Sequence, residues 1–176
     1  MFALEPLVQA TITSGLALLF VNAAVHKVRD LSRFRETLNR YDLLPRVLVP
    51  VAAALIIAAE IAVVVAAFMP AGRPFAAASG AALLLLYAAA MSINLRRGRV
   101  LMDCGCGGVS ERQPLEWWMV RRNLLLAAVA LVATLPVSAR ELGWSDLFVM
   151  SCATASAAGL YLAHATLAVA RSRVGR

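Results

Sequence analysis

The chain has 176 residues, of which 61% are hydrophobic, and a formal net charge of +7 at neutral pH. Soluble domains contain about 45–50% apolar residues, so this composition excludes an ordinary soluble protein and predicts one integral membrane domain. The basic residues stand at the ends of apolar runs rather than in one patch with interleaved aromatics, which argues against nucleic acid as a partner. We therefore expect a single all-α domain, a polytopic bundle of four to five transmembrane helices in a lipid bilayer.

The first apolar run extends over residues 7–25 and contains no charged residue. About twenty helical residues cross a bilayer core, so this run is long enough to span it. It ends at His26 and Lys27. No positive residue precedes the run and no small-residue cleavage site follows it, so we expect this helix to remain in the mature protein.

The connection over residues 31–46 is polar but carries regularly spaced apolar side chains. Phe34, Leu38 and Tyr41 lie at helical spacings, which predicts an amphipathic helix at the membrane interface. Pro45 is expected to end that helix, because proline has no backbone N–H to donate.

The second span, residues 47–69, contains one charged residue, Glu60, more than halfway along it. A carboxylate at that depth costs several kcal/mol unless it is protonated or paired, which marks it as a candidate functional residue. Lys27 and His26 are its nearest basic neighbours in the sequence, and Lys27 is the expected partner. Two interpretations follow, a structural ion pair that joins two helices and a proton-handling group, and the sequence favours the first slightly.

Three further spans are predicted over residues 75–95, 120–139 and 147–170. The second of these is the shortest, because its uncharged part begins only at residue 124 and reaches about 24 Å as a helix. It is long enough if Arg121 and Arg122 extend their guanidinium groups to the interface. In a four-span variant this segment does not cross the membrane.

The loop between the third and fourth spans contains Cys104 and Cys106, which are separated by a single glycine. Two thiols at this spacing can close a small strained disulfide, exchange with another disulfide, or bind a soft metal ion. Gly105, together with two glycines after Cys106, gives the backbone the freedom that such a small ring requires. A flexible polar loop with no chemistry is the alternative. Cys152 stands alone in an apolar segment, where we expect a small buried side chain.

The positive charges predict the orientation of the bundle. Five spans leave only Arg73 and Arg140 on one side, and the remaining fifteen basic residues lie on the other side. Because positively charged loops remain in the cytoplasm, the N-terminus is expected outside and the C-terminal tail inside. The cysteine loop then lies at the cytoplasmic end of the bundle, and a four-span arrangement leaves it on the same side.

Several short stretches together resemble the methylamine-utilisation protein MauE family, within the wider DoxX-like membrane proteins. The resemblance covers about residues 7–135, and the cysteine stretch with its flanking arginines is its most specific part. The stretches are Asn22–Lys27, Tyr41–Pro45, Glu60, Asn94–Arg99, Asp103–Gly108 and Arg121–Asn123.

The resemblance implies a multi-pass protein of the bacterial inner membrane that works with a membrane-anchored, thioredoxin-like partner, MauD. The two would help to mature the disulfide-rich small subunit of periplasmic methylamine dehydrogenase. Cys104 and Cys106 would be the catalytic pair of a membrane thiol-disulfide oxidoreductase. The supporting residues would be His26, Lys27 and Arg121, which can lower the thiol pKa, Glu60, which can carry a proton, and Asn123.

The expected chemistry and the expected orientation disagree. An enzyme that serves periplasmic disulfides should present its thiols outside, whereas the arginines put the loop at the cytoplasmic end. Either the glycine-rich loop folds back into the bundle, or electrons cross the membrane by way of the cysteines. A membrane quinone between helices would accept or donate those electrons, although no motif indicates a quinone site.

Two rival functions belong to other classes. A Cu(I)-type metal binder or transporter is suggested by the close thiols, but no further cluster of Cys, His or Met accompanies them in the sequence, and we expect no metal site. A non-catalytic assembly factor would only hold its partner at the membrane. Such a scaffold should keep its function when both cysteines are replaced.

Overall fold

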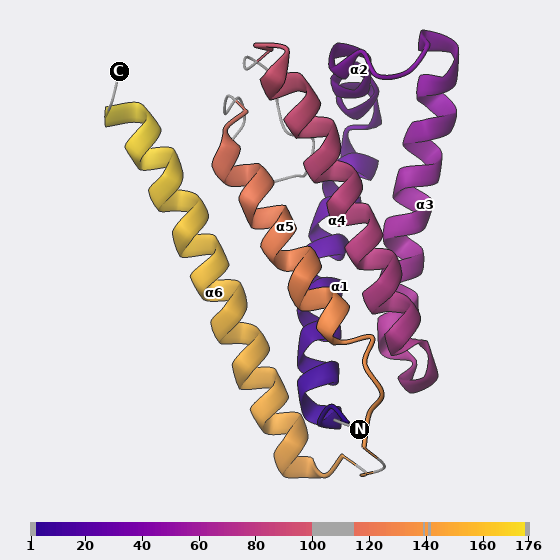
Figure 1. Ribbon diagram of the computed structural model, residues 1–176, viewed down its shortest axis with the longest axis vertical. Coiled ribbons are helices and arrows are strands. Elements are labelled where there is room, and N and C mark those ends of the chain that lie inside the picture. The colour runs from indigo at the N-terminus through magenta and orange to yellow at the C-terminus, as the bar shows by residue number, and fades with distance from the viewer. Residues whose placement is uncertain (1–2, 100–114, 139, 141, 175–176) are drawn as a thin grey trace.

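The computed structural model describes residues 3–99, 115–138, 140 and 142–174, and most of these residues are helical (Figure 1). Among the described residues, four helical segments are long and apolar enough to cross a membrane. This arrangement confirms the all-α, multi-pass membrane bundle. The helices are α1 (Pro6–Arg29), α2 (Leu31–Tyr41), α3 (Val49–Phe68), α4 (Arg73–Arg96), α5 (Trp117–Val132) and α6 (Trp144–Val174), with short 3-10 turns at Arg46–Leu48 and Pro70–Gly72.

The long helices alternate in direction along the bundle, and α2 lies across one end of it (Figure 1). That end also holds the C-terminal end of α4, the N-terminal end of α5 and the last turns of α6. The opposite end holds the N-terminus, the turn between α3 and α4, and the connection from α5 to α6. The helical order therefore brings three groups of basic residues to the same end. They lie at the end of α1 and in α2, at the end of α4 and beginning of α5, and at the end of α6.

Small side chains allow the central helices to pack closely. A Cβ atom at Gly80 of α4 would lie 3.3 Å from Cε2 of Phe20 on α1, so glycine keeps these two helices in contact. Phe20 itself is completely buried. The main core comprises Leu16, Ala17 and Phe20 of α1, Val63 and Ala67 of α3, Ala76, Ala81, Leu83 and Leu84 of α4, and Ala127 and Ala130 of α5.

The first two helices differ from their expected bounds. The helix α1 continues one turn beyond residue 25, to Arg29, and its last turns bury Lys27 instead of exposing it. Asp30 then caps α2, because its carboxylate accepts a hydrogen bond of 2.9 Å from the backbone N–H of Arg33. The helix α2 ends at Tyr41, before the proline expected to stop it, since Asp42 adopts the left-handed conformation with φ of 50°.

The helix α5 ends at Val132, although the sequence predicted a span as far as residue 139. Pro136 follows closely, and a proline disfavours helix both at its own position and at the preceding residue. The chain after α5 is instead held by the N-terminal segment. Leu4 donates a 2.7 Å hydrogen bond to the carbonyl of Pro136 and forms a β-bridge with Val137, while Gln9 donates to the carbonyl of Ala133.

The helix α6 stands apart from the other helices and packs mainly along α1 (Figure 1). One contact between the two helices joins Ser14 Oγ of α1 to Met150 Sδ of α6 at 3.7 Å. The apolar window of α6 is not buried inside the chain. Cys152 is exposed on this helix, so the expectation of a buried side chain was wrong.

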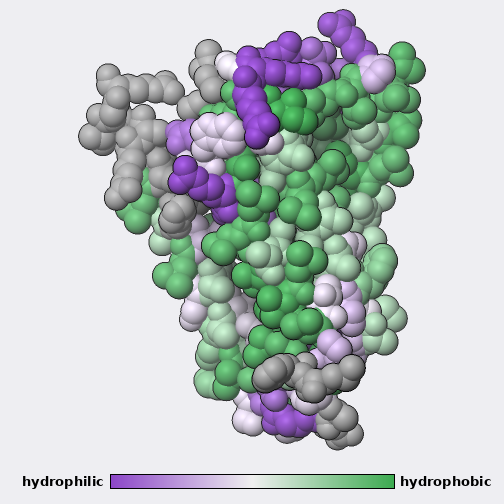
Figure 2. All heavy atoms as spheres, in the orientation of Figure 1, coloured by the Kyte–Doolittle hydropathy of each residue, from purple (hydrophilic) through white to green (hydrophobic). Residues whose placement is uncertain are grey.

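The surface supports a membrane location. Hydrophobic residues cover the middle of the face shown in Figure 2, and hydrophilic residues gather towards the two ends. Large apolar side chains with high exposure include Leu55 at 65% and Phe75 at 62%. Such a belt would be unstable in water and is the usual lipid-facing surface of a helical bundle.

Candidate functional site

The paired cysteines Cys104 and Cys106 lie in residues 100–114, outside the described residues. The residues that flank this segment are fixed to the bundle. On one side, the Arg99 guanidinium donates to the Asp42 carboxylate at 3.1 Å, and the Arg99 N–H donates to a carbonyl of α4 at 3.0 Å. On the other side, Leu115 is 2% exposed. Both stems of the cysteine loop are therefore anchored at the basic end of the bundle.

An apolar cluster lies beneath these stems, and we call it the loop-base cluster. It joins the end of α2 to α4 and to the beginning of α5. Its members are Tyr41, Ala88, Met91, Leu115, Met119 and Val120, all of them buried. Burial of these side chains stabilises the contacts among α2, α4 and α5 near the basic end.

The predicted partner of Glu60 is confirmed by the structure. The Lys27 ammonium donates to Oε1 of Glu60, which joins α1 to α3. The two side chains are 3% and 0% exposed. A lone charge at such a buried position would be very costly, so each group makes the other tolerable inside the bundle.

Two aromatic residues complete this site: Tyr87, which no sequence motif indicated, and Phe34, which was predicted only as part of an amphipathic helix. The Tyr87 hydroxyl of α4 donates to the same Oε1 atom at 2.6 Å. The Lys27 ammonium also lies 5.2 Å from the centre of the Tyr87 ring and 5.3 Å from that of Phe34 on α2. These distances allow cation–π attraction to both rings. We call Lys27, Glu60, Tyr87 and Phe34 the buried ion cluster.

The second carboxylate oxygen of Glu60, Oε2, is buried and has no hydrogen-bond partner among the described residues. The same holds for Oδ1 of Asn94 and for Nδ2 of Asn123, whose side chains are 0% and 2% exposed. Asn123 was expected to support the site, whereas Asn94 was noted only as the first residue of the Asn94–Arg99 stretch. Buried polar atoms usually have a partner, so each of these atoms can accept or donate a further hydrogen bond.

The other predicted supporting residues lie on the surface. His26 is exposed although it directly precedes the buried Lys27 in α1, and Arg121 is exposed at the beginning of α5. Arg122, its neighbour, is only partly exposed, and its guanidinium carbon lies 5.3 Å from the Trp118 ring and 5.4 Å from the Tyr161 ring of α6. The structure therefore brings Lys27 to Glu60 but leaves His26 and Arg121 outside the buried ion cluster.

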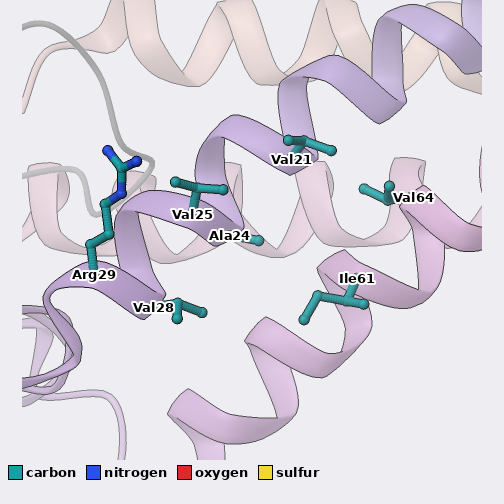
Figure 3. A pocket seen from close by; sticks show the side chains of 7 residues that line it. All are labelled: Val21, Ala24, Val25, Val28, Arg29, Ile61 and Val64. Atoms are coloured by element: carbon teal, nitrogen blue, oxygen red, sulfur yellow. The ribbon is translucent and has the colours of Figure 1, made fainter.

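An apolar groove of about 380 Å³ runs between α1 and α3 (Figure 3). Val28 of α1 lies across the groove from Ile61 and Val64 of α3, and the Arg29 side chain points away from α3. The walls suit a hydrocarbon chain, but a quinone ring also needs hydrogen-bond donors, and Arg29 is the only charged residue in the lining. The groove therefore does not identify the expected quinone site.

These features define a polytopic helical membrane protein with a buried ion cluster in its interior, in which the residues on both sides of the cysteine stretch, Arg99 and Leu115, lie at the basic end. Residues 5–136 match the family model described as methylamine utilisation protein MauE. This match covers α1 to α5 and most of the chain, so the protein belongs to the MauE family.

Curated relatives agree with this assignment. The chain is 38% identical over 146 residues to the methylamine utilization protein MauE of Paracoccus denitrificans, covering 80% of this chain and 78% of the relative. It is 35% identical over 136 residues to that of Methylorubrum extorquens, covering 76% and 73% of the two chains. The protein of the same name from Methylophilus methylotrophus is 33% identical over 159 residues, or 90% and 82% of the two chains. No solved structure matches the chain.

Proposed function

We propose that this protein is an inner-membrane thiol-disulfide oxidoreductase whose reactive pair is Cys104 and Cys106. Membership of the methylamine utilisation family carries this proposal, together with two thiols one residue apart in a loop whose stems are fixed to the bundle. Its partner would be a membrane-anchored, thioredoxin-like protein. Its final substrate would be a periplasmic protein that needs disulfides, with the small subunit of methylamine dehydrogenase as the first candidate.

The exchange requires no group beyond thiols and a disulfide. A thiolate of the partner attacks one sulfur of the Cys104–Cys106 disulfide, and the other sulfur leaves as a thiolate that takes up a proton. The second partner thiol loses its proton and attacks the resulting mixed disulfide. The partner is then oxidised to a disulfide, and Cys104 and Cys106 are reduced to two thiols. A two-electron acceptor of the quinone class would return them to the disulfide.

The spacing of the cysteines favours a catalytic disulfide over a structural one. A disulfide that closes across one residue departs from relaxed geometry, so its reduction potential should lie above roughly −300 mV, the range of catalytic rather than structural bonds. A strained disulfide is reduced more readily and therefore oxidises the thiols of a partner. His26 and Arg121, exposed and basic at the same end of the bundle, would stabilise the thiolate that leaves.

The test is thiol trapping in native membranes with single cysteine variants. Cys104→Ser or Cys106→Ser should abolish partner oxidation without preventing membrane insertion, and one of the two should accumulate a mixed disulfide with the partner. Cys152→Ser is the matched control, because this exposed thiol on α6 has no neighbouring cysteine among the described residues. It should leave activity unchanged.

Other outcomes separate the rival functions. If the double variant of Cys104 and Cys106 supports methylamine dehydrogenase maturation at the normal rate, the protein is a non-catalytic assembly factor. If the wild-type pair resists oxidation but binds one Cu(I) ion that the double variant does not bind, a metal function replaces the redox function.

A further inference from the structure

We propose that the buried ion cluster is a proton-binding site, in which Oε2 of Glu60 takes up and releases one proton while Lys27 keeps its charge. The uptake forms one O–H bond on the carboxylate and moves no electrons. This function goes beyond thiol exchange and does not depend on it.

The distribution of donors on Glu60 is the first observation. Lys27 and Tyr87 both donate to Oε1, whereas Oε2 has no donor among the described residues and is buried. A carboxylate that served only to join two helices would be most stable with both oxygens hydrogen-bonded. Here one oxygen holds the cluster together, and the other is available to a proton.

The second observation concerns Lys27. A simple buried ion pair fails when one partner becomes neutral, because the other charge is then uncompensated. In this cluster the ammonium also lies against the faces of Tyr87 and Phe34, at 5.2 Å and 5.3 Å from the ring centres. Both rings attract a cation whether or not Glu60 is ionised. The cluster therefore tolerates two protonation states of Glu60 without expelling Lys27.

The groups that face Glu60 are consistent with this role. From α1 it meets Lys27, and from α4 it meets the phenol of Tyr87. The helix α2 adds the Phe34 ring and carries Arg33 next to it in the sequence. Among the described residues, Glu60 is the carboxylate that accepts from Lys27 and Tyr87, so we assign proton uptake at this position to Glu60.

Infrared difference spectroscopy of the full-length protein in lipid nanodiscs tests the proposal. Acidification protonates the surface carboxylates as well, so the signal of Glu60 is obtained by subtracting the spectrum of Glu60→Gln from that of the wild type. The remainder should contain one C=O stretch of a protonated carboxylic acid, shifted in D₂O, which we call the Glu60 band. Glu36→Gln is the matched control, since Glu36 is 60% exposed and pairs only with Arg40 among the described residues. It should retain the band.

Tyr87→Phe provides a second, independent readout. It removes the hydroxyl that donates to Oε1 and keeps the aromatic ring, so the Glu60 band should remain but change in frequency, because the hydrogen bonding of the carboxyl group has changed, with little change in folding. If the wild type and Glu60→Gln have the same spectra throughout the pH range in which both remain helical, Glu60 does not titrate. The cluster is then a permanent ion pair, and the proposal is refuted.

Discussion

Replacing Lys27 by methionine should destabilise the bundle strongly. The change removes the ammonium but keeps a long apolar side chain, so little packing volume is lost. Glu60, which is 0% exposed, would keep only the Tyr87 donor of its two present partners. Breaking a buried ion pair on one side costs about 3–5 kcal/mol, or about two to four orders of magnitude in the ratio of folded to unfolded protein.

The converse change should cost less. In Glu60→Gln, Lys27 loses a carboxylate but keeps the faces of Phe34 and Tyr87, each of which contributes about 0.5–2 kcal/mol. The neutral amide oxygen can still accept the Tyr87 hydroxyl. We therefore expect the loss of stability to follow the order Lys27→Met greater than Glu60→Gln. The double variant should lose less than the sum, by a coupling of about 0.5–3 kcal/mol.

Reversible unfolding in mixed detergent micelles, followed by circular dichroism, measures all three variants. The surface pair of Glu36 and Arg40 is the control, because its side chains are 60% and 59% exposed and such pairs contribute less than about 0.5 kcal/mol. If Lys27→Met unfolds within about 0.5 kcal/mol of the wild type, or if the two single losses simply add, the energetic reasoning for the buried ion cluster is wrong.

Three other predictions concern the orientation of the bundle, the turn between α3 and α4, and the cap of α2. A reporter fused after residue 176 should read as cytoplasmic and one in the 71–74 turn as external, and a periplasmic tail would contradict the charge argument. Gly72→Ala should lower the melting temperature, because its Cβ would lie 2.5 Å from a carbonyl oxygen at the end of α3, whereas Gly15→Ala, where a Cβ meets nothing within 4 Å, should not. Hydrogen bonds from the Arg33 N–H and a serine hydroxyl hold the pKa of Asp30 below its usual 3.8. The stability that Asp30 gives α2 is thus present above that value and lost as the pH falls through the lowered pKa. The helicity of wild type and Asp30→Ala should converge on acidification.

The sequence correctly predicted two kinds of feature: helices that depend on the hydropathy of a single segment, and an ion pair whose absence would cost much free energy in the membrane. The apolar runs indicated the long helices, because hydropathy over about twenty residues is a local property. The pairing of Lys27 with Glu60 was also predictable, since few partners can offset a carboxylate in the membrane. Both predictions required no knowledge of how the helices pack.

Features that depend on packing were missed. Tyr87 joins Glu60 only because α3 and α4 meet in a particular register, and Phe34 joins Lys27 only because α2 folds back over the end of α1. One signal was available, since a tyrosine among the alanines and leucines of residues 75–95 needs a partner for its hydroxyl. The exposure of Cys152 had no sequence signal, because burial in a membrane helix depends on which side meets another helix and which meets lipid.

The loop-base cluster bears on how a thiol pair at the basic end could serve a periplasmic substrate. If entry of the cysteine loop into the bundle opened this cluster, it would expose Tyr41, Met91 and Leu115, which are 6%, 1% and 2% exposed. Burying each such side chain stabilises a protein by about 1.5–3 kcal/mol relative to exposing it. Under the proposed thiol exchange, such a cost would favour reaction at the basic end, with electrons carried across the membrane. A partner confined to the opposite side would then need a second carrier, whereas one that reaches the basic end could exchange directly with Cys104 and Cys106.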